Sequence, residues 1–120
     1  MKKSSIPPPG ERRRHPRIKI SLEVEWGETP ACVHEGRITS LSVRGCFLQT
    51  PLEVSKGGAV FIRVFLAPES ERVTEGVVWG RVAYHMPGAG LGVEFKRLPP
   101  GYEEHIQDLV DFHLASGQDS

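Results

Sequence analysis

The chain has 120 residues, which is enough for one domain with a single hydrophobic core. It carries 15 basic and 15 acidic residues, so its formal net charge at pH 7 is zero. No run approaches the roughly 18 apolar residues of a membrane span, and the two N-terminal lysines are not followed by the apolar segment of a secretion signal. We therefore expect a soluble, cytoplasmic protein that does not insert into a membrane.

The balanced total hides a strong asymmetry of charge along the chain. Residues 1–19 carry seven lysines and arginines against one glutamate, which gives a net charge of +6. The last 20 residues carry five acidic residues and no lysine or arginine. An anionic partner is therefore expected at the N-terminal end and not over the whole surface.

The two cysteines, Cys32 and Cys46, form no CxxC motif, and the five histidines have no metal-ligand spacing. We interpret both cysteines as reduced residues of the core or of strands. The sequence predicts neither a metal site nor a cofactor.

The first ten residues include three consecutive prolines and few apolar side chains, so we expect a disordered tail over residues 1–10. The folded domain is expected over residues 11–115, and a second disordered tail over residues 116–120. Between the first tail and the first strand, the segment Arg12–Arg17 contains four arginines in six residues. Their planar guanidinium groups suit phosphates and the acceptor edge of guanine.

An unbroken alternation of apolar and polar residues from Ile18 to Trp26 predicts a half-buried strand. Turn signals at fairly regular spacing separate five further predicted strands, at about residues 31–41, 46–50, 59–66, 73–84 and 91–95. Six short strands of this kind favour a mainly β fold, an antiparallel barrel. After residues 99–101 the apolar period becomes helical, which predicts one amphipathic helix across an end or side of the barrel.

Two positions in these strands invite a specific structural interpretation. Gly45, at the corner between the second and third strands, suggests a left-handed residue or a bulge. Trp79 and Arg81 share one face of the long fifth strand. We interpret Trp79 as a core residue; the alternative is an exposed ring on which a base could stack.

One set of residues has the chemistry of a nucleotide site. Arg13 and Arg17, four apart in an extended arm, lie up to about 14 Å from each other and could address two groups of one ligand. Ser40, Ser42 and Gly45 offer two hydroxyls and a bare backbone at a corner between strands. Each half alone is a weak signal, because basic runs are often solvated tails and Ser-Gly turns are often only turns. Their joint occurrence in this order strengthens the interpretation.

The same residues resemble a known family. The run Arg13–Arg17 (RRHPR), the segment Ile38–Leu48 (ITSLSVRGCFL) and the segment Gly90–Phe95 (GLGVEF) look like a PilZ domain, over about residues 11–114. The resemblance implies a six- or seven-stranded antiparallel β-barrel of the split-barrel type with one C-terminal α-helix. It also implies a receptor for the bacterial second messenger cyclic di-GMP.

The resemblance assigns roles to four residues by position. Arg13 and Arg17 would form the RxxxR arm, which wraps the ligand and meets its phosphates and guanine faces. Ser42 and Gly45 would occupy two positions of the (D/N)xSxxG turn, which holds a guanine edge.

Three further candidates do not match a motif position. Arg12 and Arg14 are supporting charges beside the arm. Ser40 stands where the family has Asp or Asn, and a neutral hydroxyl accepts fewer hydrogen bonds than a carboxylate. Losing a charge-assisted hydrogen bond costs about 1.5–3 kcal/mol, or roughly 10- to 100-fold in affinity. Thr39 could substitute in part, although on an ideal strand it points to the other face.

The resemblance thus implies a non-enzymatic signalling protein, in which cyclic di-GMP orders the arm and a protein partner reads the changed surface. One alternative is an interaction adaptor that keeps the barrel but has lost nucleotide binding because of Ser40. Another is nucleic-acid binding through the arm, which is disfavoured because the strands show no regular series of exposed aromatics and residues 20–120 are net acidic. An enzyme is disfavoured because no general base, nucleophile or metal set can be assembled.

Overall fold

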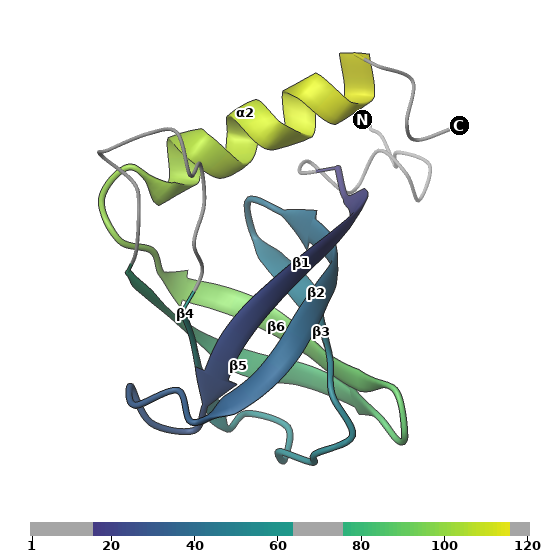
Figure 1. Cartoon of the computed structure of the whole chain (residues 1–120), viewed down its shortest axis with the longest axis vertical. Coiled ribbons are helices and arrows are strands. Elements are labelled where there is room, and N and C mark those ends of the chain that lie inside the picture. The colour runs from purple at the N-terminus through teal and green to yellow at the C-terminus, as the bar shows by residue number, and fades with distance from the viewer. Residues whose placement is uncertain (1–15, 64–75, 116–120) are drawn as a thin grey trace, which may run out of the picture.

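The structure, a computed structural model, describes residues 16–63 and 76–115. Within these ranges the chain forms six strands and one helix, which lies across one end of the strands (Figure 1). The elements are β1 (Ile18–Gly27), β2 (His34–Ser42), β3 (Gly45–Gln49), β4 (Ala59–Arg63), β5 (Val77–Met86), β6 (Gly90–Arg97) and α2 (Tyr102–Ala115). The predicted tails at residues 1–10 and 116–120 lie outside the described residues.

The strands close into an antiparallel barrel in the order β1-β2-β3-β6-β5-β4. Four of the six strand pairings join strands that are consecutive in the sequence. The other two, β3 with β6 and β1 with β4, join strands that are farther apart in the sequence. The β1–β4 ladder, which places Trp26 opposite Ile62, closes the barrel. Closure removes the exposed sheet edges that would otherwise invite aggregation.

The barrel interior is built from the alternation read in the sequence. In β1, Ile18, Val24 and Trp26 are buried, and the charged residues between them are exposed. The same inward pattern runs through β4, where Val60 and Ile62 are completely buried. The predicted barrel with a single C-terminal helix is therefore confirmed.

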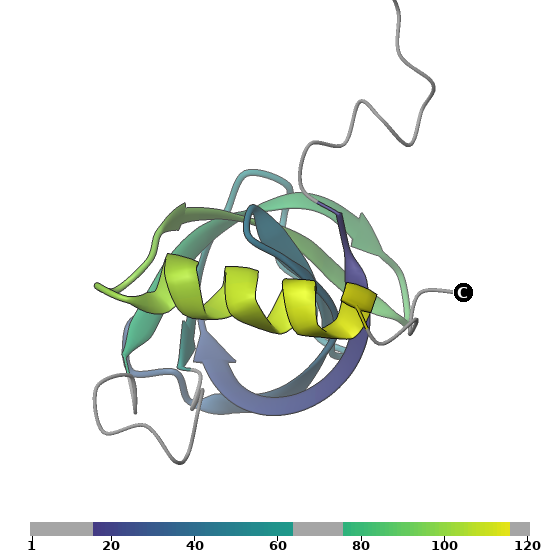
Figure 2. The same ribbon diagram turned by 90° about the horizontal axis from the view of Figure 1, so that it is seen from above.

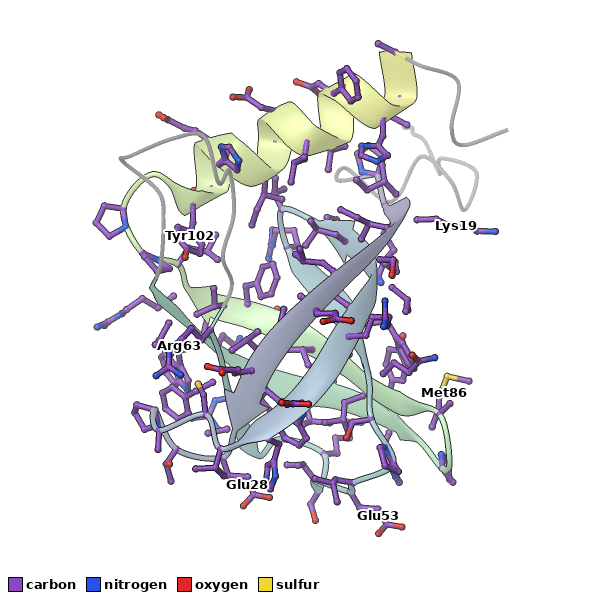
Figure 3. The ribbon with its side chains drawn as sticks, in the orientation of Figure 1. Lys19, Glu28, Glu53, Arg63, Met86 and Tyr102 are labelled. Carbon is purple, nitrogen blue, oxygen red and sulfur yellow. The ribbon has the colours of Figure 1, made fainter. Side chains whose placement is uncertain are left out.

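The helix α2 covers one open end of the barrel, as the view from above shows (Figure 2). Its buried side chains are Tyr102, Ile106 and Val110, spaced by four residues so that they fall on one face. Tyr102 points from the first turn toward the strands (Figure 3). Together with Leu22 and Phe95, these side chains seal the core beneath the helix.

The second strand begins later than predicted, at residue 34 rather than about 31. The preceding residues form a turn in which the N–H of Cys32 donates to the carbonyl of Thr29 at 3.1 Å. Cys32 has a φ of 52°, a left-handed conformation that cannot continue a strand. The predicted ends of the fourth and fifth strands, at residues 64–66 and 73–75, lie outside the described residues.

Trp79 is on the outer face of β5, so its interpretation as a core residue was wrong. Its neighbours Val78 and Gly80 are buried, whereas Trp79 itself is only half-buried. The guanidinium of Arg81 lies 5.5 Å from the centre of the indole ring, in cation–π geometry. Apolar character alone could not tell the two faces of this strand apart.

Candidate ligand-binding site

The start of β1 lies beside the end of β2. Ile18 pairs with Leu41, and Lys19 pairs with Ser40. Arg17, which directly precedes β1, is exposed and lies close enough to Cys46 for its positive charge to act on the thiol. The structure therefore brings Arg17 to the corner that contains Ser40, Ser42 and Gly45. Arg12, Arg13 and Arg14 lie outside the described residues.

Ser42 shapes the corner between β2 and β3. It pairs with Gly45 across a two-residue turn, and its Oγ accepts a hydrogen bond from the N–H of Arg44 at 3.1 Å. The carbonyl of Arg44 in turn accepts from the N–H of Phe95 at 2.8 Å, which ties the corner to β6. Ser42 is only 2% exposed. In this structure its hydroxyl fixes the turn and does not project from the surface.

Gly45 is required by packing against a neighbouring strand. Gly45 is in β3, which pairs with β6. A Cβ on Gly45 would overlap the carbonyl oxygen of Val93 in β6. Its φ is not positive, in contrast to those of Gly57 and Gly88 at 86° and 76°. The prediction that Gly45 is left-handed or part of a bulge was therefore wrong. The close approach of the two backbones explains instead why a glycine stands at this position.

The bulge lies five to seven residues before Gly45, in β2. The register between β2 and β3 shifts between Ile38 and Ser40. Ile38 and Leu41 are both buried, and the two residues between them, Thr39 and Ser40, are both half-buried. The assignment of Thr39 to the face opposite Ser40 assumed an ideal strand, and the bulge breaks that alternation.

Lys19 is a basic residue at this site that sequence reasoning did not select. It lies directly opposite Ser40 and is exposed, pointing away from the barrel (Figure 3). Its place on the polar face of the first predicted strand was the available signal. Only the pairing of β1 with β2 shows that this ammonium group stands beside the serine.

Both cysteines are buried free thiols, as the sequence predicted. Burial raises the pKa of Cys46 to about 12, and the positive charge of Arg17 opposes that shift in part. Burial also raises the pKa of Cys32. Neither thiol has the low pKa of a reactive cysteine, so neither is a candidate nucleophile.

A cleft of about 550 Å³ lies beside the corner, between the end of β6 and the start of α2. Its charged lining residues are Arg44, Lys96, Arg97, Glu103 and Glu104. Because both signs of charge line this cleft, its electrostatics select neither an anion nor a cation. The outer surface around Ser40, with Arg17 and Lys19 beside it, is the more specific candidate for an anionic ligand.

The matching family model is that of the PilZ domain, and it covers residues 11–112. The chain belongs to the PilZ domain family. The match spans the arm, the β2–β3 corner and nearly all of α2. A search of the curated proteins found no match.

Solved structures with PilZ-type folds are similar to this chain. The Bacillus subtilis inhibitor of motility MotI/DgrA has 18% identity and a TM-score of 0.68, with 92% of this chain and 57% of that chain covered. The PilZ domain of CeSA from a cellulose-synthesizing bacterium has 22% identity and a TM-score of 0.56, with 82% and 97% covered. The K. pneumonia MrkH–c-di-GMP complex has 16% identity and a TM-score of 0.62, with 91% and 56% covered.

These likenesses support the PilZ fold. This chain spans just over half the length of MotI/DgrA and of MrkH. In the two described ranges, no group of three or more His, Cys, Asp or Glu residues could hold a metal ion. Within the same ranges, no helix has the length and apolar character needed to cross a membrane.

Proposed function

We propose that this PilZ domain is a non-enzymatic receptor for cyclic di-GMP, which binds on the outer surface where β1 begins beside β2. The observation that carries the proposal is the pairing of Ile18 with Leu41 and of Lys19 with Ser40. This register fixes the base of the arginine arm next to the serine–glycine corner. The arm and the corner can therefore contact one ligand from two sides.

The chemistry of the two halves suits a cyclic dinucleotide. Arg13 and Arg17 supply permanently charged, planar donors for phosphates and for the acceptor edge of guanine. Arg12 and Arg14 add positive charge to the same segment, and Lys19 adds an ammonium group beside Ser40. Membership in the PilZ family supports cyclic di-GMP as the ligand.

The corner residues contribute in different ways. Ser40 is half-buried on the outside of β2, where its hydroxyl can accept from the guanine Watson–Crick edge. The bulge places Thr39 beside it between two inward residues, so a second hydroxyl stands close to the same position. Ser42 and Gly45 act through the shape of the turn, because one is buried and the other is packed against Val93.

Binding would act as a switch by ordering the arm. An arm held to the ligand by several charge-assisted hydrogen bonds presents a new surface next to β1 and β2. A protein partner in the cytoplasm would read that surface. No chemical step on the nucleotide is needed for this role.

Ser40 favours a second candidate function, that of a protein-interaction adaptor without nucleotide binding. The family's Asp or Asn is absent at this position, and a hydroxyl accepts fewer hydrogen bonds than a carboxylate. An adaptor would keep the barrel and bind its partner with no dependence on Arg13 and Arg17.

The deciding experiment is a calorimetric titration of cyclic di-GMP into the wild-type chain and into the Arg13→Ala/Arg17→Ala variant, with GTP as a control ligand. The receptor predicts micromolar or tighter binding that is specific, weakens as salt rises, and is lost in the double variant. Arg63→Ala is the matched control, because Arg63 is bound to Glu25 at 2.7 Å, near the opposite end of β1 from Lys19. Its affinity should equal that of the wild type.

Two results would contradict the receptor. Absence of heat at high ligand concentration, confirmed by NMR, would favour the adaptor. Equal binding of cyclic di-GMP and any long polyanion would instead indicate a non-specific basic tail.

A further inference from the structure

The outer face of β4, β5 and β6 carries aromatic and arginine side chains side by side. Phe61 faces outward, because Val60 and Ile62 on either side of it are completely buried. Phe61 pairs with Trp79, and Trp79 pairs in turn with Arg97. Directly opposed residues of antiparallel strands share a face, so these three side chains form one row on the outside of the barrel.

Arg81 lies beside this row, two residues along β5 from Trp79. Its guanidinium is 5.5 Å from the centre of the indole ring and donates to the carbonyl of Gly57 at 2.8 Å. Both contacts restrain the guanidinium over the indole. We call Phe61, Trp79, Arg81 and Arg97 the aromatic–arginine face. Tryptophan and arginine are enriched among the residues that contribute most to the energy of protein interfaces.

The aromatic–arginine face and its surroundings on β6 are positively charged. Glu94, which pairs with Arg81 across the ladder, forms an ion pair with Lys96 at 3.4 Å. Arg81, Lys96 and Arg97 against Glu94 give this region a net charge of +2. An acidic surface is therefore its electrostatic complement.

The solvent side of α2 has the complementary charge. The helix carries four acidic residues and no lysine or arginine. Glu104, Asp108 and Asp111 are all exposed, and their spacing by four and three residues places them in one stripe opposite the buried side of the helix. Phe112, which is 67% accessible, stands beside this stripe. We call these four residues the acidic helix face.

The two faces match in the spacing of their charges and in length. Arg81 and Arg97 are diagonal neighbours on adjacent antiparallel strands, which places them about 7–8 Å apart. Along α2, the rise of the helix separates Glu104 from Asp108 by about 6 Å and from Asp111 by about 10 Å. The helix is roughly 21 Å long and the five-residue ladder of β4 with β5 roughly 17 Å. One helix can therefore lie over the whole of the aromatic–arginine face.

We propose that these two faces form the interface of a symmetric dimer, in which the acidic helix face of one copy packs against the aromatic–arginine face of the other. Phe112 packs beside the outward rings of β4 and β5, and the guanidinium groups pair with the helix carboxylates. The two faces are neighbours on one molecule, because Arg97 and Glu104 line the same cleft between β6 and α2. A two-fold axis can therefore join both pairs of faces at once and close the assembly at two copies.

A second copy of this chain fits the aromatic–arginine face better than a nucleic acid does. The acidic helix face, which adjoins it, repels a polyanion, and Arg81 already covers the indole of Trp79 in cation–π geometry. The complementary charge and an exposed aromatic anchor are both present on the same chain. The interface contains no residue of β1 or β2, where we propose that the nucleotide binds, so dimerisation goes beyond the proposed function and does not depend on it.

The test is sedimentation equilibrium of the full chain without nucleotide, at about 5–500 μM, where weak protein interfaces associate. The wild type should show a reversible monomer–dimer equilibrium. Arg97→Glu and Asp108→Lys each place like charges at both contacts of the dimer and should weaken association by at least about 10-fold. Phe112→Ala removes an aromatic anchor and should weaken it by a similar factor. Glu53→Lys is the matched control, because Glu53 lies at the end of the barrel opposite α2 (Figure 3), and it should associate like the wild type.

An equimolar mixture of the Arg97→Glu and Asp108→Lys chains tests the pairing of the two faces directly. In the mixed dimer, one contact joins the two reversed charges and the other joins the two original charges. Association of the mixture should therefore return to within about threefold of the wild type, although each variant alone associates weakly.

Three results would contradict the dimer. A wild-type chain that stays monomeric at every concentration would overturn it and leave the receptor untouched, because the samples contain no nucleotide. A dimer that both charge reversals leave unchanged would exclude these two faces as its interface. A mixture that associates no better than either variant alone would exclude the reciprocal pairing. Thermal unfolding at low concentration, where association adds no stability, shows that each variant is folded.

Discussion

Gly45 in β3 packs directly against the carbonyl oxygen of Val93 in β6, with no room for a Cβ. This contact joins the corner that begins at Ser42 to β6. Gly45, for which we propose a role in ligand binding, therefore also has a structural role.

Replacement of Gly45 by Ala should lower stability in the absence of any ligand. The added methyl group forces β3 and β6 apart, and overpacking of this kind costs about 1–3 kcal/mol of unfolding free energy. Urea unfolding measures the loss. Gly88→Ala is the matched control, because its φ is 76° and no atom lies within 4 Å of the added methyl group. That variant should lose some stability through backbone strain and keep its affinity for cyclic di-GMP, whereas Gly45→Ala should lose both.

Replacement of Ser40 by Asp should strengthen the binding of cyclic di-GMP by roughly 10- to 100-fold, since a carboxylate accepts charge-assisted hydrogen bonds from guanine. Calorimetry at fixed salt measures the gain. Ser55→Asp adds the same charge on an exposed loop and should leave the affinity unchanged. An affinity that falls in Ser40→Asp would show that Ser40 meets a phosphate and not a guanine edge.

Local patterns in the sequence were sufficient to predict most elements of the fold. The alternation of apolar and polar residues that starts at Ile18 predicts a strand with one buried face. The change to a helical spacing of apolar residues after Pro100 predicts the helix. Both signals are local, because each depends on which side of a single element faces the core. The motif residues around Ser42 could likewise be found without a structure.

The remaining features depend on contacts between distant parts of the chain. No local pattern shows that β1 closes the barrel on β4, or that Lys19 lies beside Ser40. The bulge before Ser40 shifts the faces of β2, which strict alternation could not anticipate. The outward side of Trp79 was missed for the same reason, since an apolar residue on a barrel strand fits either face.

Replacement of Tyr102 by Ala should strongly destabilise the domain. The side chain is buried between α2 and the barrel, and truncating a buried aromatic residue costs about 3–5 kcal/mol. That cost is a large fraction of the stability of a small domain. Chemical unfolding of Tyr102→Ala and of a control, Phe112→Ala, measures the difference in their free energies of unfolding. Phe112 is on the exposed side of the same helix. The Phe112 variant should stay within about 0.5 kcal/mol of wild type, and equal losses in the two variants would show that α2 does not seal the barrel.

The buried thiol of Cys46 should make stability fall at alkaline pH. Burial raises its pKa from an ordinary value of 9.0 to about 12 in the folded state. Below pH 9 both states keep the proton, so this group adds no pH dependence. Between pH 9 and about 12 the unfolded chain loses the proton and the folded chain keeps it, so the folded state binds more protons and the free energy of unfolding decreases as pH rises.

The expected slope from this one group approaches roughly 1 kcal/mol per pH unit. Urea unfolding of wild type and Cys46→Ala at several values between about pH 8 and pH 10.5 measures it, and the variant should show the shallower decline. Val60→Ala, a truncation of a completely buried residue with no titrating group, is the control. It should lower stability by a similar amount at every pH, and a Cys46 variant that behaves in the same way would show that the thiol ionises equally in both states.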